Sequence, residues 1–561
     1  MVVSNNIKLS MVLEFFTIFD AAQLTIYSEK GVNRMFFLFG KSKNDSKRRR
    51  NVKISIAIPV YNAGKHIHAA LDSLKNQTMK KSDFEVICVN DKSTDNSEAV
   101  IKRYQETMGN LILINREENS GGPMIPRNDA IRAARGKYLM FLDNDDFIGE
   151  ETLERFYKAA EENHSDVIFG KYVGVNGRGV PQSQFKRGNR PQAEILEDNL
   201  VFTLAPHKMF RLDFLRENGF EFHPKAVVGE DQLFVMQCYI RANVITVLAD
   251  YDYYYVVSRG DENLSLKYFP AEEFFFSFNR IMEFIEESEL DLIYKNKVKM
   301  AFLNRFLHSS RLRSYLLSPR RLTESQKREW LNAAKEFFGT HLTDEELLKI
   351  KPHFRYFVEI CKENNLEKLL DVHQKMENLH ADDITRVEDG LIYARFRRAD
   401  EQLAYDEEYI ANGKNVSHVF LKDFTFGRTS SFSVDFQLPL LVHFPVQYRL
   451  VFIHRKTGIE VSDDYQSHTD FMFDMEKLLI DRHLGPWDLF IEGEIKGFTH
   501  RRRLGASRAG HIREKQPIEA LSHGRHYSIR PYYTQKYDNL SFDVKPLKVK
   551  ERAAGYSGKE R

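Results

Sequence analysis

Ile54-Ser-Ile-Ala-Ile-Pro-Val60 is the first of four short apolar runs in this chain. The others are Phe84-Glu-Val-Ile-Cys-Val89, Leu111-Ile-Leu-Ile114 and Tyr138-Leu-Met-Phe-Leu142. Between these runs, apolar residues recur at helical spacing, as they do in residues 67–74. Strands that are apolar on both faces and alternate with amphipathic helices predict a mostly parallel α/β sheet covered by helices on both sides.

Polar and acidic residues follow each of the four runs. They are Tyr61 and Asn62, Asn90 to Asp95, Asn119 to Pro123 with Arg127, and Asp143 to Asp146. Ligands of such sheets bind beyond the carboxyl ends of the strands, so these residues predict one site. Each group alone also has a structural explanation, because an aspartate can cap the next helix and Gly121-Gly122-Pro123 can form a turn. Their repetition at four consecutive strand ends favours a site.

Asp143 and Asp145 are the predicted metal ligands. Carboxylates separated by one residue point the same way along an extended backbone. Crowding them is costly unless a cation lies between them. Oxygen ligands suit Mg²⁺ or Mn²⁺, which also bind substrate phosphates, so the pair predicts departure of a phosphate-linked leaving group. The alternative is an exposed acidic loop.

Four motifs in this order resemble glycosyltransferase family 2, which has the GT-A fold, a Rossmann-like and mostly parallel α/β domain. They are Pro59-Val-Tyr61-Asn62, Val89-Asn90-Asp91-x-Ser93-Thr94-Asp95, Asp143-x-Asp145-Asp146 and Glu230-Asp231-Gln232-Leu233-Phe234. Asn90 stands where members of the family often have a second aspartate. The runs Asn119-Ser-Gly-Gly-Pro123 and Gly174–Ser183 further resemble the wall teichoic acid glycosyltransferases, which act on poly(ribitol phosphate).

The resemblance implies an inverting transfer of N-acetylglucosamine from UDP-GlcNAc to a cell-wall polyol-phosphate polymer, with Mn²⁺ or Mg²⁺ as cofactor. It implies that six residues contact the nucleotide-sugar: Pro59, Tyr61, Asp91, Asn119, Arg127 and Asp143. Asp91 is expected to accept a hydrogen bond from the uracil, and the fork of Arg127 suits a phosphate or a uracil carbonyl. The rival functions are synthesis of capsular or extracellular polysaccharide and a non-catalytic carbohydrate-binding scaffold.

Asp231, with Glu230 beside it, is the predicted catalytic base. An inverting transfer needs one carboxylate to take the proton of the acceptor hydroxyl, and it needs no covalent nucleophile. The alternative is that both residues only cap the helix that follows, since helix N-termini favour carboxylates.

Arg178 and Arg259 are predicted to contact the phosphates of the acceptor. Arg178 lies in a basic, loop-rich stretch, and Arg259 follows the run Tyr253-Tyr-Tyr255. Binding through these residues would depend on salt. The alternative is solvated loop charge.

The pattern beyond the sheet changes twice. The catalytic domain is predicted over residues 51–270. Helical spacing of apolar residues predicts a helical linker domain over 271–380, and alternation along Phe432–Leu438 predicts a β-sandwich over 384–548. Residues 1–50 are predicted to be a poorly ordered extension and 549–561 a basic tail. The C-terminal domain is expected to form a homo-oligomer, a trimer by the resemblance, or to bind the polymer.

Composition excludes other classes of protein. The 561 residues carry 82 Lys and Arg against 80 Asp and Glu, so the chain has no large excess of positive charge that would favour binding to nucleic acid. Three cysteines without metal-ligand spacing indicate a reducing compartment. The chain has no uninterrupted apolar run of about 18 residues, so the sequence predicts no transmembrane segment. We therefore expect a cytoplasmic protein, and Lys47-Arg-Arg-Arg50 could hold it at the inner face of the cell membrane or belong to a solvated extension.

Overall fold

The computed structural model describes residues 23–29, 32–38, 52–259, 268–309, 311–319, 321–389, 391–396, 409–410, 418–509, 512, 515–535 and 537–547. The chain divides into two compact units, residues 1–305 and 306–561. Each unit is described by itself.

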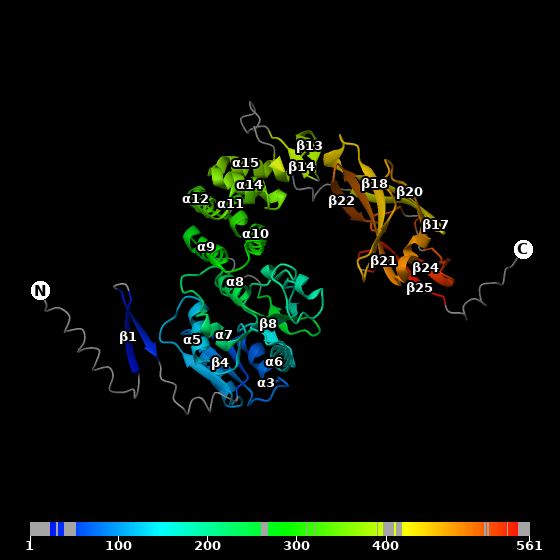
Figure 1. Ribbon diagram of the computed structural model, residues 1–561. Coiled ribbons are helices and arrows are strands. Elements are labelled where there is room, and N and C mark those ends of the chain that lie inside the picture. The colour runs from blue at the N-terminus through cyan, green and yellow to red at the C-terminus, as the bar shows by residue number, and fades with distance from the viewer. Residues whose placement is uncertain are drawn as a thin grey trace, which may run out of the picture. The chain divides into compact units, whose positions relative to one another are not determined.

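A seven-stranded sheet forms the core of the first unit (Figure 1). All its strand pairs are parallel except the two that the short strand β10 makes with its neighbours. Every residue of β3 and β4 is buried, as their apolar runs predict. In spatial order, the strands are β11 (Ile245–Leu248), β8 (Val167–Gly170), β10 (Met209–Arg211), β6 (Tyr138–Phe141), β3 (Ile54–Val60), β4 (Phe84–Asn90) and β5 (Leu111–Asn115).

Amphipathic helices cover this sheet. The helix after β3, for example, buries Ile67, Ala70, Leu71 and Leu74 on one face. The helices of this layer are α3 (Ile67–Lys75), α4 (Ser97–Gln105), α5 (Met124–Ala133), α6 (Thr152–Asn163), α7 (Leu212–Glu217) and α8 (Glu230–Arg241). Beside the main sheet, three short strands form a second one: β7 (Phe147–Ile148), β12 (Tyr254–Val257) and β9 (Tyr172–Val175). The predicted mostly parallel GT-A architecture is confirmed.

A series of helices follows the sheet domain. The first is α9 (Ala271–Glu287), which packs against α8, and the division between the two units falls within α10 (Leu292–Ser309). In the second unit, Thr323 and Gln326 form a capping box at the start of α12, and Trp330 is fully buried. The remaining helices are α11 (Arg311–Leu317), α12 (Glu324–His341), α13 (Asp344–Leu347), α14 (Pro352–Glu363) and α15 (Leu366–Glu377).

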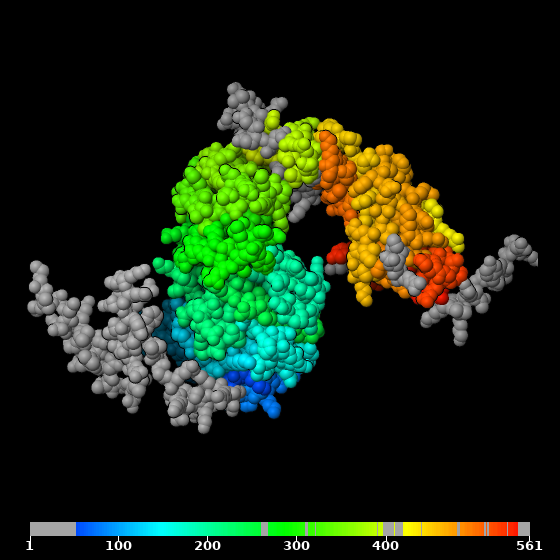
Figure 2. All heavy atoms as spheres, in the orientation of Figure 1, coloured from blue at the N-terminus to red at the C-terminus, as the bar shows by residue number. Residues whose placement is uncertain are grey.

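Antiparallel strands make up the rest of the second unit, and their atoms run from yellow-green to red in Figure 2. Buried and partly buried residues alternate along β17, as the sequence predicts. The buried Phe432 of β17 meets Phe452 of β18 and Phe542 of β25, which belong to the seven-stranded sheet. The first small sheet is β13 (Ile384–Glu388), β14 (Leu391–Ala394) and β15 (Tyr409–Ile410). The facing sheets are β16 (His418–Thr425), β17 (Thr429–Gln437) and β20 (Asp470–Asp474), against β19 (Glu460–Ser462), β18 (Gln447–His454), β21 (Gly485–Ile495), β22 (Phe498–Arg503), β25 (Leu540–Pro546), β24 (Arg525–Tyr533) and β23 (Ile518–Ser522).

Near the N-terminus, the structure describes one antiparallel hairpin, β1 (Gln23–Glu29) paired with β2 (Val32–Leu38). The rest of the predicted 1–50 extension, its basic run and the 549–561 tail lie outside the described residues. In the part of the chain that is described, no helix is both long enough and apolar enough to cross a membrane.

Candidate active site

The predicted site residues of the first unit gather at one edge of the main sheet. Pro59 belongs to the end of β3 and Asp91 directly follows β4, while Asp143 comes two residues after β6. Glu230 and Asp231 form the first turn of α8. Residues far apart in sequence are therefore held together by strand ends and a helix start, as expected of a parallel sheet.

Arg127 of α5 connects the two acidic groups of the site. Only 4% of this residue is exposed, and its guanidinium lies 5.0 Å from the ring of Phe222. One terminal nitrogen, Nη2, donates to Asp143 Oδ1 at 2.9 Å, and the other, Nη1, donates to Glu230 Oε1 at 3.3 Å. Its buried Nε has no hydrogen-bond partner among the described residues. A single side chain thus pairs a carboxylate after β6 with one at the start of α8.

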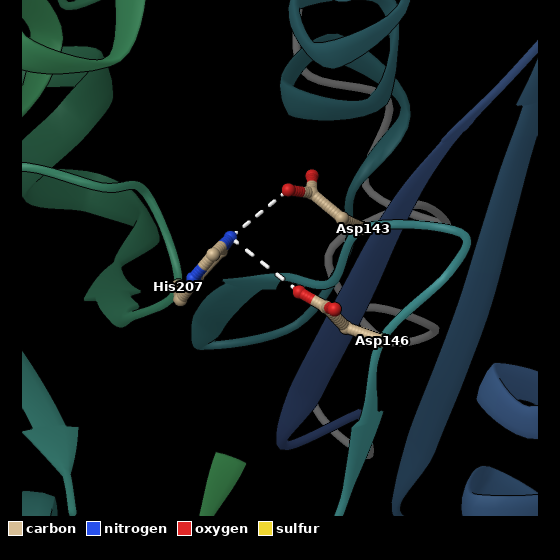
Figure 3. Close-up of side chains that lie close together, drawn as sticks. All are labelled: Asp143, Asp146 and His207. Atoms are coloured by element: carbon tan, nitrogen blue, oxygen red, sulfur yellow. Dashed lines mark hydrogen bonds and ion pairs between the residues drawn. The ribbon is translucent and has the colours of Figure 1, made fainter. Parts of the chain in front are cut away.

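Asp143, Asp146 and His207 form a cluster (Figure 3). The imidazole points between the two carboxylates, with Nε2 at 2.9 Å from Asp143 Oδ2 and 3.8 Å from Asp146 Oδ2. The ring of Tyr254 stacks on His207 at 4.4 Å between centroids. Burial raises the pKa of Asp143, but Arg127 and His207 outweigh it and hold that pKa well below its usual range. Burial, with Asp143 and Asp145 nearby, raises the pKa of Asp146 to about 7.

The donor atoms of this cluster fit a divalent metal. One oxygen or nitrogen from each of the three residues lies within 4.8 Å of the others, and carboxylate and imidazole ligands suit Mn²⁺. Asp145, in contrast, forms an ion pair with Arg259, in which Nη2 lies 2.5 Å from Oδ2.

The local backbone explains why Asp143 lies near Asp146 rather than paired with Asp145. β6 ends at Phe141, and the backbone N–H of Asp146 donates to the carbonyl of Asp143 at 3.2 Å. The segment is thus a turn, where first and fourth residues approach, whereas the expectation for Asp143 and Asp145 assumed extended backbone. The assignment of Asp145 as a metal ligand stays a prediction.

Asp91 organises the loop predicted to hold the nucleotide. Its buried carboxylate accepts hydrogen bonds from the backbone N–H and the hydroxyl of Ser120, at 3.0 and 2.8 Å, and pairs with Arg116 at 2.9 Å. Asn119 donates its side-chain amide to the Asp91 carbonyl at 2.8 Å. At the end of β3, the carbonyl of Pro59 accepts from the Asn144 side chain at 2.8 Å, and Tyr61 is half exposed. The residues predicted to frame the uridine therefore lie around one loop.

The start of α8 holds Glu230 and Asp231 in a largely buried position. Gly229 precedes them with φ of +77°, a left-handed conformation that favours glycine. Gly229, not either carboxylate, occupies the N-cap, and Asp231 accepts from the backbone N–H of Gln232 at 2.7 Å. Burial raises the pKa of Asp231, and burial together with Asp231 raises the pKa of Glu230 to about 7. A carboxylate with a raised pKa is a better proton acceptor at neutral pH.

Comparison with known proteins decides the family. The model "Glycosyl transferase family 2" matches residues 55–219, "Glycosyl transferase TarS linker domain" matches 271–373, and "TarS beta-glycosyltransferase C-terminal domain 1" matches 441–544. A poly(ribitol-phosphate) beta-glucosyltransferase of Bacillus spizizenii is 36% identical over 528 residues, which cover 90% of this chain and 80% of that one. The chain belongs to glycosyl transferase family 2.

Solved relatives of this chain include TarS of Staphylococcus aureus, a poly(ribitol-phosphate) beta-N-acetylglucosaminyltransferase. The TarS sequence is 30% identical over 508 residues, which cover 87% of this chain and 84% of TarS. The TarS crystal structure matches 89% of this chain and 86% of its own with a TM-score of 0.61 and 26% identity. Residues 1–349 of TarS with UDP-GlcNAc match 64% of this chain and 99% of that one, with a TM-score of 0.58 and 32% identity. This glycosyltransferase therefore shares the TarS architecture of sheet domain, helical linker and C-terminal β-domain.

His207 is a residue of this glycosyltransferase that no sequence motif indicated, and Lys208 beside it is fully buried. Lys208 Nζ donates to the carbonyl of Ala205 at 2.6 Å, and the hydroxyl of Tyr172 donates to the carbonyl of His207 at 3.3 Å. Burial lowers the pKa of Lys208 to about 7. These contacts hold the turn that carries His207. The only signal in the sequence is a histidine and a lysine directly before a short strand.

The two predicted acceptor-binding arginines have different surroundings. Arg259 is engaged with Asp145, at the edge of the cluster. Arg178 is exposed in the loop after β9, and its side chain makes no ion pair with any described residue. The structure does not bring Arg178 and Arg259 into contact, and their roles stay predictions.

Proposed function

We propose that this glycosyltransferase transfers a sugar from a UDP-sugar to poly(ribitol phosphate), with inversion at the anomeric carbon. The observation that carries the proposal is the bridge made by Arg127 between Asp143 and the Glu230–Asp231 pair. It puts a proton acceptor with a raised pKa next to the acidic cluster at the strand ends. The similarity to a beta-glucosyltransferase and a beta-N-acetylglucosaminyltransferase of poly(ribitol phosphate) supports the acceptor and the stereochemistry.

In the proposed reaction, Asp231 takes the proton of an acceptor hydroxyl as its oxygen attacks the anomeric carbon. The bond between that carbon and the diphosphate oxygen breaks, and UDP leaves with the bonding electrons. Asp91, Asn119, Pro59 and Tyr61 hold the nucleoside side of the donor. Arg127 keeps its charge and orients Asp143 and Glu230, and Arg178 and Arg259 attract phosphates of the polymer.

The proposal includes a divalent metal held by Asp143 with Asp146 and His207, or with Asp145. When bound, Mn²⁺ or Mg²⁺ would neutralise the charge that develops on the leaving diphosphate. The geometry of the cluster supports the first ligand set, because its donor atoms already converge.

We further propose that residues 51–270 are the catalytic domain, that 271–380 link it to the β-domain of 384–548, and that the β-domain assembles a homo-oligomer. The match of the C-terminal strands to a TarS domain supports the domain division. Three buried free cysteines are in keeping with action in a reducing compartment.

A donor and acceptor screen tests the function. UDP release is measured with UDP-GlcNAc and with UDP-glucose, each with poly(ribitol phosphate), poly(glycerol phosphate) or no acceptor. We expect release to depend on poly(ribitol phosphate) and on one of the two sugars. Equal release without any polymer, or turnover of neither donor, would refute the proposal.

A further inference from the structure

A second pocket lies in the first unit, outside the site described above. It has a volume of about 370 Å³ and lies between residues 218–224, α8 and α9. The segment 218–224 begins after α7, where Gly219 adopts φ of +64° and lets the chain turn toward α9. We call this cavity the 218–224 pocket. Its volume is in the range of sites that bind small molecules or parts of larger ligands.

The lining of the 218–224 pocket combines three chemistries. Phe220 and Phe284 supply aromatic surface, with ring centroids 6.4 Å apart. Gln237 of α8 contributes a side-chain amide. His223 and Arg280 contribute basic groups. Such a lining offers contacts to C–H groups, to hydroxyls and to an anion.

Arg280 is the group of the pocket that best suits an anion. Burial lowers the pKa of His223, and the positive charges of Arg280 and Lys225 lower it further, so His223 offers a hydrogen-bonding nitrogen rather than a positive charge. The acidic lining residue Glu221 pairs with Arg132 at 2.8 Å, and Arg132 also pairs with Asp129 at 2.7 Å. Arg280 pairs with Glu283 at 2.6 Å, but its side chain is 55% exposed and can reorient toward a ligand.

The pocket adjoins the reaction centre through shared elements. Phe222 lines the pocket, and its ring also lies under the guanidinium of Arg127. Gln237 stands on the same helix as Asp231, six residues later, which is about 9 Å along the axis at 1.5 Å per residue. A polymer whose reacting unit lies at Asp231 has further units within reach of a pocket at this distance.

We propose that the 218–224 pocket binds one polyol-phosphate unit of the acceptor polymer, away from the unit that receives the sugar. The inference rests on the proposed function and assigns a second acceptor subsite to it. The polyol's carbon chain lies against Phe220 and Phe284, a hydroxyl bonds to Gln237, and the phosphate lies near Arg280 and His223. Such a subsite would hold a long acceptor between transfers without adding to the chemical step.

The test compares single ribitol phosphate as a short acceptor with long poly(ribitol phosphate), on the full chain and two variants. Arg280→Gln removes a charge, and Gln237→Leu removes the amide without changing charge. Arg103→Gln, on the exposed surface of α4, is the matched control for loss of a charge. For both pocket variants we expect KM for the long polymer to rise about 3- to 10-fold, the effect of losing one hydrogen bond or ion pair. The kcat, the KM for the UDP-sugar and the KM for single ribitol phosphate should stay at wild-type values.

Other results would overturn the subsite. An unchanged KM for the long polymer would show that the pocket does not bind it. Equal losses with the short and long acceptors would place both residues at the reacting unit, and an equal loss in Arg103→Gln would reduce the effect to general surface charge. Failure of the wild type to use either acceptor would refute the proposed function itself. Calorimetric binding of poly(ribitol phosphate) without donor would then still test the pocket, because loss of binding in both variants would support it and unchanged binding would contradict it.

Discussion

Asp231 is the side chain on which the proposed chemistry depends most directly. Asp231→Asn keeps the shape of the side chain but removes the proton acceptor. Turnover should fall by about 10²–10⁴-fold, the usual scale for loss of a general base. Affinity for the UDP-sugar and the melting temperature should barely change. Near-wild-type turnover would exclude Asp231 as the base, and Glu230 would become the next residue to test.

The pH dependence of kcat/KM should report the same residue. Because burial raises the pKa of Asp231, kcat/KM should fall as the pH drops through a value above the ordinary aspartate pKa of about 3.9. The value of kcat/KM falls at low pH because the base acts only in its deprotonated form. In Glu230→Gln this fall at low pH should persist, since Asp231 still titrates. If the fall disappears in Glu230→Gln, the titrating base is Glu230 instead.

At the scale of elements, the turn after β6 distinguishes two ligand sets for the metal. Chelation by EDTA should abolish turnover, and Mn²⁺ or Mg²⁺ should restore it. If Asp143, Asp146 and His207 hold the ion, His207→Ala should raise the Mn²⁺ concentration needed for half-maximal rescue about 10- to 100-fold or more. Direct Mn²⁺ binding by electron paramagnetic resonance should weaken in parallel. Asp145→Ala should leave Mn²⁺ binding nearly unchanged. If Asp145→Ala weakens Mn²⁺ binding and His207→Ala does not, the ligands are Asp143 and Asp145 instead. Full activity in EDTA would remove the metal from the mechanism.

The turn before β10 makes a prediction about stability. The folded pKa of Lys208 is about 7, below the unfolded value near 10.5, so the unfolded chain binds more protons between these two values. The cost of burying Lys208 is therefore complete below pH 7 and is relieved as the pH rises toward 10. Lys208→Met should raise the melting temperature most at pH 6, and the difference should shrink by pH 10. A difference that does not vary with pH would show that Lys208 is not buried as a cation.

The elements themselves follow from the sequence, and the details of the site follow less well. Ile54–Val60 and Phe84–Val89 are apolar at every buried position but one or two, so their strands and order could be predicted. Asp143 could be found because it follows such a strand. His207 could not, because 64 residues separate it from Asp143 and only the antiparallel insertion of β10 beside β6 brings them together. Asp146 could not be predicted as a ligand either, because the alternation of an extended strand does not apply within a turn.

At the scale of the whole molecule, the β-domain can be removed from the rest of the chain by truncation. A chain that ends near Asp382 keeps every residue of the candidate site and loses the β-domain. We expect it to be smaller than a multimer by light scattering and to retain turnover on a short acceptor. A truncated chain that stays multimeric would contradict the assembly role of the β-domain. A folded but inactive one would show that the catalytic unit extends beyond residue 382.

The fork of Arg127 also works as a spacer of fixed width. A guanidinium is planar and rigid, so its two terminal nitrogens hold Asp143 and Glu230 at a constant separation, which a lysine with one charged nitrogen could not do. In the proposed reaction, Asp143 belongs to the donor half of the site and Glu230 to the acceptor half. The separation of these two carboxylates is thereby set before either substrate arrives, so binding of a substrate need not spend free energy on bringing them into place.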